Sequence, residues 1–152
     1  MSAVKAFLRY WLPIAIWLAL IFIGSTDLMS AEHTSRFIGP LLHWLYPTIS
    51  PFTILRVQLF VRKLAHVSEY AVLAVLLYRA VVHTTLKGRR ALSAALVLVL
   101  CAAYAASDEF HQSFVPSRTA SVRDVMIDIC GATLALILYW SIATRRIIAS
   151  RS

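Results

Sequence analysis

The stretch YWLPIAIWLALIFIGS, residues 10–25, carries no charged side chain and approaches the roughly 20 apolar residues that a helix needs to cross a bilayer. Three further apolar blocks of similar length follow, at about residues 64–82, 91–107 and 125–143. The 152-residue chain is 60% hydrophobic and 14% charged, whereas about a quarter of the residues in a soluble domain are charged. We therefore predict an all-α membrane protein, a four-transmembrane-helix bundle that forms a single domain over residues 1–152.

Basic residues are concentrated next to the apolar blocks, and they predict how the chain sits in the membrane. Lys and Arg that flank spanning helices are retained on the cytoplasmic side, so we expect both termini in the cytoplasm. Basic residues between the first two blocks argue weakly for the opposite orientation. Those that favour cytoplasmic termini are Lys5, Arg9, Lys87, Arg89, Arg90, Arg145, Arg146 and Arg151, and those that oppose them are Arg36, Arg56, Arg62 and Lys63.

The formal net charge of +8 would also suit a nucleic-acid-binding protein. The basic residues cluster at helix ends, however, and form neither a single stripe nor an RNA-binding motif. Anionic lipid headgroups are the nearer partner, so we predict membrane lipids and no nucleic acid as partners. The sequence leaves the oligomeric state open.

Residues 26–62 form a connection that is long for a helical bundle. The segment is apolar but interrupted by three prolines, and Trp44 and Tyr46 suit a membrane–water interface. We predict an interfacial segment of one or two short helices on the outer leaflet. It would either cover a polar site as a lid or lie passively on the membrane, and the passive role is the more ordinary one.

Ionisable side chains occur at one end of each of the last three apolar blocks. Inside a membrane they cost about 2.5–3.5 kcal/mol each and usually face the bundle interior or a wet cavity. The second block opens with RKLAHVSEY, residues 62–70, the third ends in DEFHQ, residues 108–112, and the fourth begins beside Asp124. In a four-span bundle these ends lie at the same depth. We predict a charged extracytoplasmic pocket built from Lys63, His66, Glu69, Tyr70, Asp108, Glu109, Gln112, Arg118, Asp124 and Asp128.

Three motifs stand out in these regions: KLAHVSEY, residues 63–70, DEFHQSFVPSR, residues 108–118, and DVMIDICG, residues 124–131. Taken together they resemble the VanZ-like family of small bacterial membrane proteins, over about residues 20–140. The residues that carry the resemblance are Lys63, His66, Tyr70, Asp108, Glu109, Gln112, Phe114, Pro116, Arg118, Asp124, Asp128 and Gly131.

The chain departs from the usual pattern of that family at three positions. Arg62 stands where an acidic residue often precedes the lysine, Ser117 where glycine often precedes the arginine, and Asp128 where asparagine is common. One hypothesis is that Asp128 and Arg62 form a swapped ion pair.

The resemblance implies a multi-pass protein of the bacterial cytoplasmic (inner) membrane. The founding member of the family is associated with low-level resistance to teicoplanin, a glycopeptide antibiotic that binds cell-wall precursors. A contribution to glycopeptide tolerance through the cell envelope is therefore what the resemblance suggests.

The first functional hypothesis is binding of an anionic envelope lipid or a polyprenyl-linked wall precursor. Arginine supplies a planar fork of donors and lysine a compact charge, and both suit a phosphate. The same cations could instead meet ordinary headgroups, and the whole cluster could be an ion-pair network that locks the bundle. The residues predicted to bind the ligand are Lys63, Glu69, Tyr70, Gln112, Arg118, Asp124 and Asp128.

An intramembrane hydrolase or transferase acting on a lipid-linked phosphate is the second hypothesis. Asp108 or Glu109 would act as the general acid or base, and His66 would carry protons. The sequence does not decide between an enzyme and a binding protein. Proton-coupled transport is weaker, because the other halves of the helices carry few ionisable groups that could complete a pathway.

A metal site is the less favoured interpretation of the histidines. His66 and Glu69 form H-x-x-E, and His111, Asp108 and Asp124 could complete the three protein ligands of a catalytic zinc site. The sequence contains no HExxH motif and no paired-cysteine spacing, and a histidine hydrogen-bonded to a carboxylate is the commoner arrangement. We therefore predict no metal and no cofactor.

Overall fold

The fold contains helices and no strand among the residues that the computed structural model describes, 3–26, 31–116 and 120–149. Four helical segments are long and apolar enough to cross a membrane, Val4–Ser25, Pro51–Thr85, Arg90–Gln112 and Val122–Ala143, which confirms the predicted four-helix membrane fold. In chain order the elements are α1 (Ala3–Tyr10), α2 (Leu12–Ser25), α3 (Ala31–Leu45), α4 (Pro51–Ala80), the π-helical turn η2 (Val81–Thr85), α5 (Arg90–Gln112) and α6 (Val122–Ala149).

Helix α4 begins well before the apolar block from which the second span was predicted. Ser50 caps it, since its Oγ accepts a hydrogen bond from the backbone N of Thr53 at 3.2 Å, and Pro51 occupies the first turn. Residues 51–62, expected in the connection, are therefore continuous with the spanning helix. At 30 residues α4 is about 45 Å long, more than the hydrocarbon thickness of about 30 Å.

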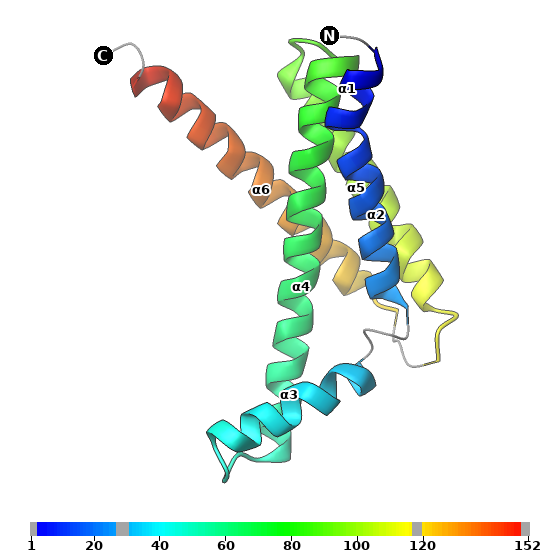
Figure 1. Ribbon diagram of the computed structural model, residues 1–152, viewed down its shortest axis with the longest axis vertical. Helices are drawn as coiled ribbons and strands as arrows, with labels where there is room; N and C mark the ends of the chain where they lie inside the picture. The colour runs from blue at the N-terminus through cyan, green and yellow to red at the C-terminus, as the bar shows by residue number, and fades with distance from the viewer. Residues whose placement is uncertain (1–2, 27–30, 117–119, 150–152) are drawn as a thin grey trace.

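Helix α3 is the short helix that remains between the first two spans, and it lies across the end at which α4 begins (Figure 1). Phe37 and Trp44 on this helix are 79% and 78% exposed. Large exposed aromatic side chains on a short amphipathic helix suit the membrane interface, in agreement with the predicted interfacial segment.

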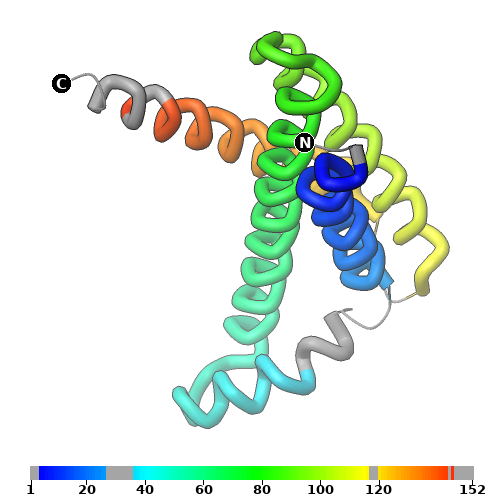
Figure 2. The backbone as a smooth tube through the Cα atoms, turned by 45° about the horizontal axis from the view of Figure 1, so that its top comes forward, coloured from blue at the N-terminus to red at the C-terminus, as the bar shows by residue number. Residues whose placement is uncertain are grey.

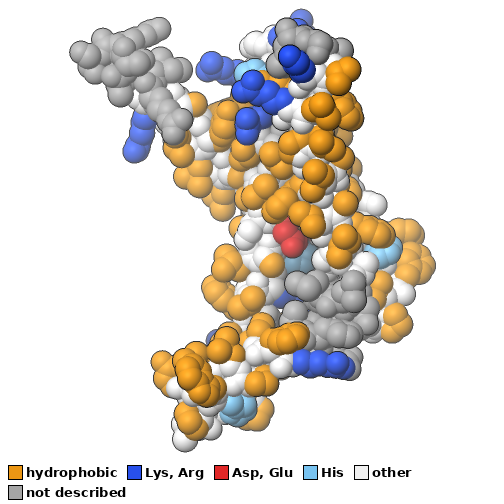
Figure 3. Space-filling view, viewed as in Figure 1, with side chains coloured by type: hydrophobic (Ala, Val, Ile, Leu, Met, Phe, Trp, Pro, Cys, Tyr) orange, Lys and Arg blue, Asp and Glu red, His pale blue; other side chains and the backbone are white. Residues whose placement is uncertain are grey.

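Helices α4 and α6 cross at the centre of the fold, and α2 and α5 run beside α4 (Figure 1). The second half of α6 diverges from the other helices, which is clearest in Figure 2. The start of α1 and the end of α6 lie at the same end of the bundle. Figure 3 shows Lys and Arg side chains gathered at that end, which carries the exposed residues Lys5, Arg9, Lys87, Arg89, Arg90 and Arg145.

The interior of the bundle is narrow, and most large apolar side chains lie outside it. Hydrophobic side chains cover much of the middle of the face drawn in Figure 3, as expected where helices contact lipid. Trp17 Nε1 donates to the carbonyl oxygen of Glu69 at 2.9 Å, and the Tyr104 hydroxyl donates to the carbonyl oxygen of Leu18 at 2.8 Å. These bonds tie α2 to α4 and α5. The fully buried apolar residues include Tyr70, Leu73, Ala74, Val97, Cys101, Ala105 and Ala132.

Candidate functional site

Buried polar side chains gather where α4, α5 and α6 meet, towards the end of the bundle opposite the start of α1 and the end of α6. Burying a polar group is costly unless it is hydrogen-bonded, so a cluster of such residues in an apolar bundle needs an explanation. The ionisable helix ends predicted from the sequence supply this cluster. Its members among the described residues are His66 of α4, Asp108, Glu109 and Gln112 of α5, and Asp124 and Asp128 of α6.

An ion pair and a hydrogen bond join α4 to α6. Lys63 Nζ lies 2.8 Å from Asp124 Oδ1, and His66 Nδ1 lies 3.1 Å from Asp128 Oδ1. Both helices rise towards the same end of the bundle in Figure 1. The step of three residues from Lys63 to His66 on α4 therefore matches the step of four residues, about one turn, from Asp124 to Asp128 on α6. The Lys63 side chain remains 44% exposed, whereas the Asp128 side chain is 1% exposed. The first pair therefore lies at the edge of the cluster and the second inside it.

Gly131 lets the two helices come close enough for these pairs. A Cβ added at this position would lie 2.5 Å from the carbonyl oxygen of Val67 and 3.0 Å from its Cα. Both contacts are with backbone, which cannot rotate away as a side chain can. Small residues at helix contacts in membranes serve this purpose. Gly131 follows Asp128 by one turn, and Val67 follows His66, so the close contact adjoins the buried pair directly.

Gln112 connects α5 to its neighbour α4. Its Nε2 donates to Asp108 Oδ2 at 3.0 Å, one helical turn away, and its Oε1 accepts from Arg62 Nη2 at 3.4 Å. Gln112 is fully buried and Asp108 is 6% exposed. The hypothesis of an ion pair between Asp128 and Arg62 is wrong, because Arg62 donates to Gln112 and Asp128 bonds to His66.

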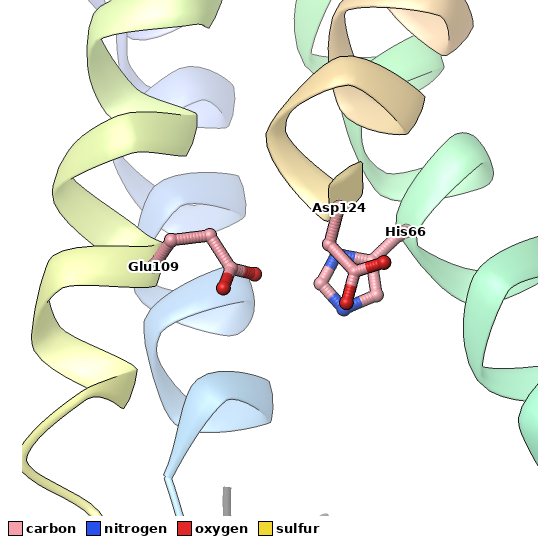
Figure 4. Close-up of side chains that lie close together, drawn as sticks. All are labelled: His66, Glu109 and Asp124. Carbon is pink, nitrogen blue, oxygen red and sulfur yellow. The ribbon is translucent and has the colours of Figure 1, made fainter. Parts of the chain in front are cut away.

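Glu109 extends from α5 towards Asp124 of α6 and His66 of α4 (Figure 4). Its Oε2 accepts from the backbone N of Ser121 at 2.7 Å, whereas its Oε1 is buried and has no hydrogen-bond partner among the described residues. Each of the three residues offers a ligand atom, and these atoms lie within 4.8 Å of one another. Three helices thus present a carboxylate, a second carboxylate and an imidazole to one small volume.

The remaining residues predicted for the pocket lie around this volume or outside the described residues. Tyr70 is fully buried, and its hydroxyl has no partner among the described residues. Glu69 is half-buried and directs Oε1 towards α2, where a Cβ on Gly24 would lie 3.7 Å away. His111 faces α2 as well, with its ring 4.9 Å from that of Phe22. Arg118 lies outside the described residues.

Two features of the site were not found by reasoning from the sequence. Arg62 was treated as a departure from a family pattern, yet it reaches Gln112 on the neighbouring helix. The backbone N of Ser121 fixes Glu109, and no side-chain pattern could reveal a backbone donor in a loop.

The profile of the VanZ/LLP1 family matches residues 10–144, which covers most of the first span, the whole of the other three and every residue of the site described above. The chain belongs to the VanZ/LLP1 family. No curated protein and no solved structure matches the chain. This VanZ-family chain is a multi-pass membrane protein whose apolar helices contact lipid.

Proposed function

We propose that this VanZ-family protein binds the phosphate of an anionic envelope lipid or a lipid-linked wall precursor at the cluster where α4, α5 and α6 meet. The observation that carries the proposal is the placement of Lys63. Its ammonium is held by Asp124 at 2.8 Å while the side chain stays 44% exposed at the edge of a buried polar cluster. A lysine oriented by one carboxylate retains N–H donors for a phosphate oxygen.

Arg62 supports the same assignment from the preceding position on α4. Its Nη2 donates to Gln112, and its Nε is buried without a partner among the described residues. Two adjacent cations beside buried hydrogen-bonding groups match the planar and compact donors that phosphate recognition uses. By the sequence motif Arg118 belongs to the same group, and the proposed ligand contacts also include Glu69, Tyr70 and Asp128.

The proposal places the site on the extracytoplasmic side of the bacterial cytoplasmic membrane, with both termini in the cytoplasm. The exposed basic residues at the end that holds α1 and the end of α6 support this orientation, because Lys and Arg beside spans are retained inside. Glycopeptide (teicoplanin) tolerance would then follow from binding of an envelope lipid or precursor at this site. Alkaline phosphatase fused to the C-terminus should be inactive in cells, and an active fusion would contradict the orientation.

Lipid binding by purified protein tests the proposal. Native mass spectrometry in detergent would compare retention of phosphatidylglycerol and undecaprenyl phosphate with that of phosphatidylcholine. We expect Lys63→Ala and Arg118→Ala each to weaken binding of the anionic lipids about tenfold, the size of one charge-assisted hydrogen bond. Asp108→Asn should change binding little.

Lys87→Ala is the matched control, since Lys87 is exposed at the opposite end of the bundle. It should leave the affinity for both anionic lipids unchanged. If Lys63→Ala and Lys87→Ala weakened binding equally, general attraction to a basic surface would explain the data and the proposed site would be wrong.

A hydrolase or transferase is the second candidate, and the convergence of Glu109, His66 and Asp124 favours it. In a hydrolysis step, Glu109 would take a proton from water while the water oxygen bonds to phosphorus. The bond from phosphorus to the bridging oxygen would break, and His66 would give a proton to that leaving oxygen. Glu109 suits the role of general base better than Asp108 does. Asp108 Oδ2 already accepts a hydrogen bond from Gln112, whereas Glu109 Oε1 has no partner among the described residues.

Phosphate release from undecaprenyl diphosphate separates the two candidates. An enzyme would release phosphate, and Glu109→Gln would abolish the release while preserving substrate binding. A binding protein would release none from any lipid-linked phosphate offered, although it would retain the lipid.

A further inference from the structure

Glu109, His66 and Asp124 have the geometry of a metal centre. Their ligand atoms lie within 4.8 Å of one another, and the three residues are 5%, 7% and 9% exposed. The three side chains come from three different helices and converge on one volume (Figure 4). Ligand atoms around a tetrahedral zinc ion lie about 3.4 Å apart, as metal–ligand distances of about 2.1 Å require.

The unpartnered oxygen of Glu109 is a separate observation that points to a ligand. Oε1 is buried, receives no hydrogen bond from the part of the chain that the structure describes, and belongs to a side chain aimed at His66 and Asp124. A buried carboxylate oxygen without a donor is destabilising, and a bound cation removes that cost. Oε2 is fixed by the backbone N of Ser121, which orients the carboxylate.

His66 is held in the manner of a metal-ligating histidine. Asp128 Oδ1 lies 3.1 Å from Nδ1, so the carboxylate fixes the ring and leaves Nε2 as the nitrogen for another partner. Carboxylate–histidine–metal arrangements of this kind set the tautomer and the orientation of the ligand. Asp128 is fully buried, as a residue that supports a ligand from behind would be.

We propose that His66, Glu109 and Asp124 bind one divalent transition-metal ion, with zinc as the best match. One imidazole and two carboxylates favour zinc or a neighbouring transition metal over Mg²⁺ and Ca²⁺, which prefer oxygen ligands alone. Asp124 has two carboxylate oxygens, so Lys63 and the ion can share it. Three protein ligands leave a fourth position open, as in zinc sites that bind a water or a substrate oxygen.

Metal binding by untagged, chelator-treated protein in detergent tests the proposal without any lipid. Inductively coupled plasma mass spectrometry should find one zinc per chain after incubation with zinc chloride and desalting, and calorimetry should show weaker binding of Mg²⁺ and Ca²⁺. Glu109→Gln and His66→Gln should lose the bound zinc. Asp128→Asn should weaken zinc binding about 10- to 100-fold, as expected for a residue that orients a ligand.

Asp108→Asn and His83→Gln are the matched controls. Asp108 is the carboxylate adjacent to Glu109 but accepts from Gln112, and His83 is an exposed histidine in η2, beyond the end of α4. Both variants should keep one zinc per chain. Zinc binding that survived Glu109→Gln and His66→Gln, or no zinc in the wild-type protein, would overturn the proposal.

X-ray absorption spectroscopy of zinc in the wild-type protein keeps the test independent of how the variants fold. One imidazole nitrogen with oxygen ligands is the expected first shell. Sulfur ligands, or a shell without imidazole, would overturn the proposal. Because the zinc experiments contain no lipid, a protein without zinc would leave the result of the lipid-binding assay unaffected. Likewise, a protein that fails to bind lipid would leave the zinc measurement unaffected.

Discussion

The two ends of the α4–α6 pair are built differently. Near the site, Gly131 places α6 against the backbone of Val67, and His66 bonds to Asp128 one turn away. Towards the other end α6 diverges (Figure 1), and a cavity of about 610 Å³ opens between α4, η2, α5 and α6. Aromatic rings line it, and Tyr78 meets the rings of Tyr139 and Trp140 edge-on at 5.6 and 6.0 Å.

The difference shows what fixes the geometry of the site. In a membrane, lipid tails are as apolar as the side chains between helices, so apolar contact alone gives little reason for two helices to adopt one register. Directional polar pairs and close backbone contact do give such a reason. The narrow end of the pair, where Gly131 meets Val67, therefore fixes the positions of the site residues. The wide end, where α6 diverges and the cavity opens, tolerates changes in side-chain size.

The largest effect is expected from Gly131→Ala at the narrow end. The new Cβ would overlap the Val67 carbonyl, so α6 must shift and the free energy of unfolding should fall by about 3 kcal/mol, the upper part of the range for overpacking. Thermal or denaturant unfolding of purified protein in detergent would measure it. Gly39→Ala is the control, because a Cβ there meets nothing within 4 Å. Equal stability of the two variants would contradict the close helix contact.

A smaller effect is expected from Trp17→Phe, which removes the hydrogen bond from α2 to the Glu69 carbonyl but keeps an aromatic ring. The free energy of unfolding should fall by about 1 kcal/mol, the usual net contribution of one hydrogen bond. Trp44→Phe, at a site 78% exposed on α3, should leave the unfolding curve unchanged. If both substitutions had the same effect, α2 would not be anchored as described.

The smallest effect is expected from Ala143→Leu at the wide end. Ala143 lines the cavity on the same helix as Gly131, and the larger side chain can extend into that space. The change in the free energy of unfolding should stay within about 0.5 kcal/mol, as for ordinary surface substitutions. A loss as large as that of Gly131→Ala would remove the contrast between the two ends.

Much of the fold followed from the sequence, because apolar blocks of bilayer length have few alternatives to spanning helices. The same reasoning predicted that ionisable groups near His66, Asp108 and Asp124 would share one depth, since each is too costly to face lipid. These groups lie together in the structure. Whether they bind or transform a ligand stays a prediction.

The pairing of individual residues could not be predicted in the same way. Whether Asp128 meets Arg62 or His66 depends on the rotation and register of α4 against α6, and these follow from the close contact at Gly131. The early start of α4 was missed because the prolines of the connection suggested interruptions. Pro51 behind Ser50 is instead a favourable helix start.

A double-mutant cycle on His66 and Asp128 tests most directly that polar pairing between α4 and α6 builds the site. Unfolding free energies of His66→Ala, Asp128→Ala and the double variant would be measured in chelator, so that no metal contributes. The account predicts a coupling energy of at least about 1 kcal/mol, within the range for residues in contact. Additive effects within about 0.5 kcal/mol would mean that the two side chains do not interact, and would contradict it.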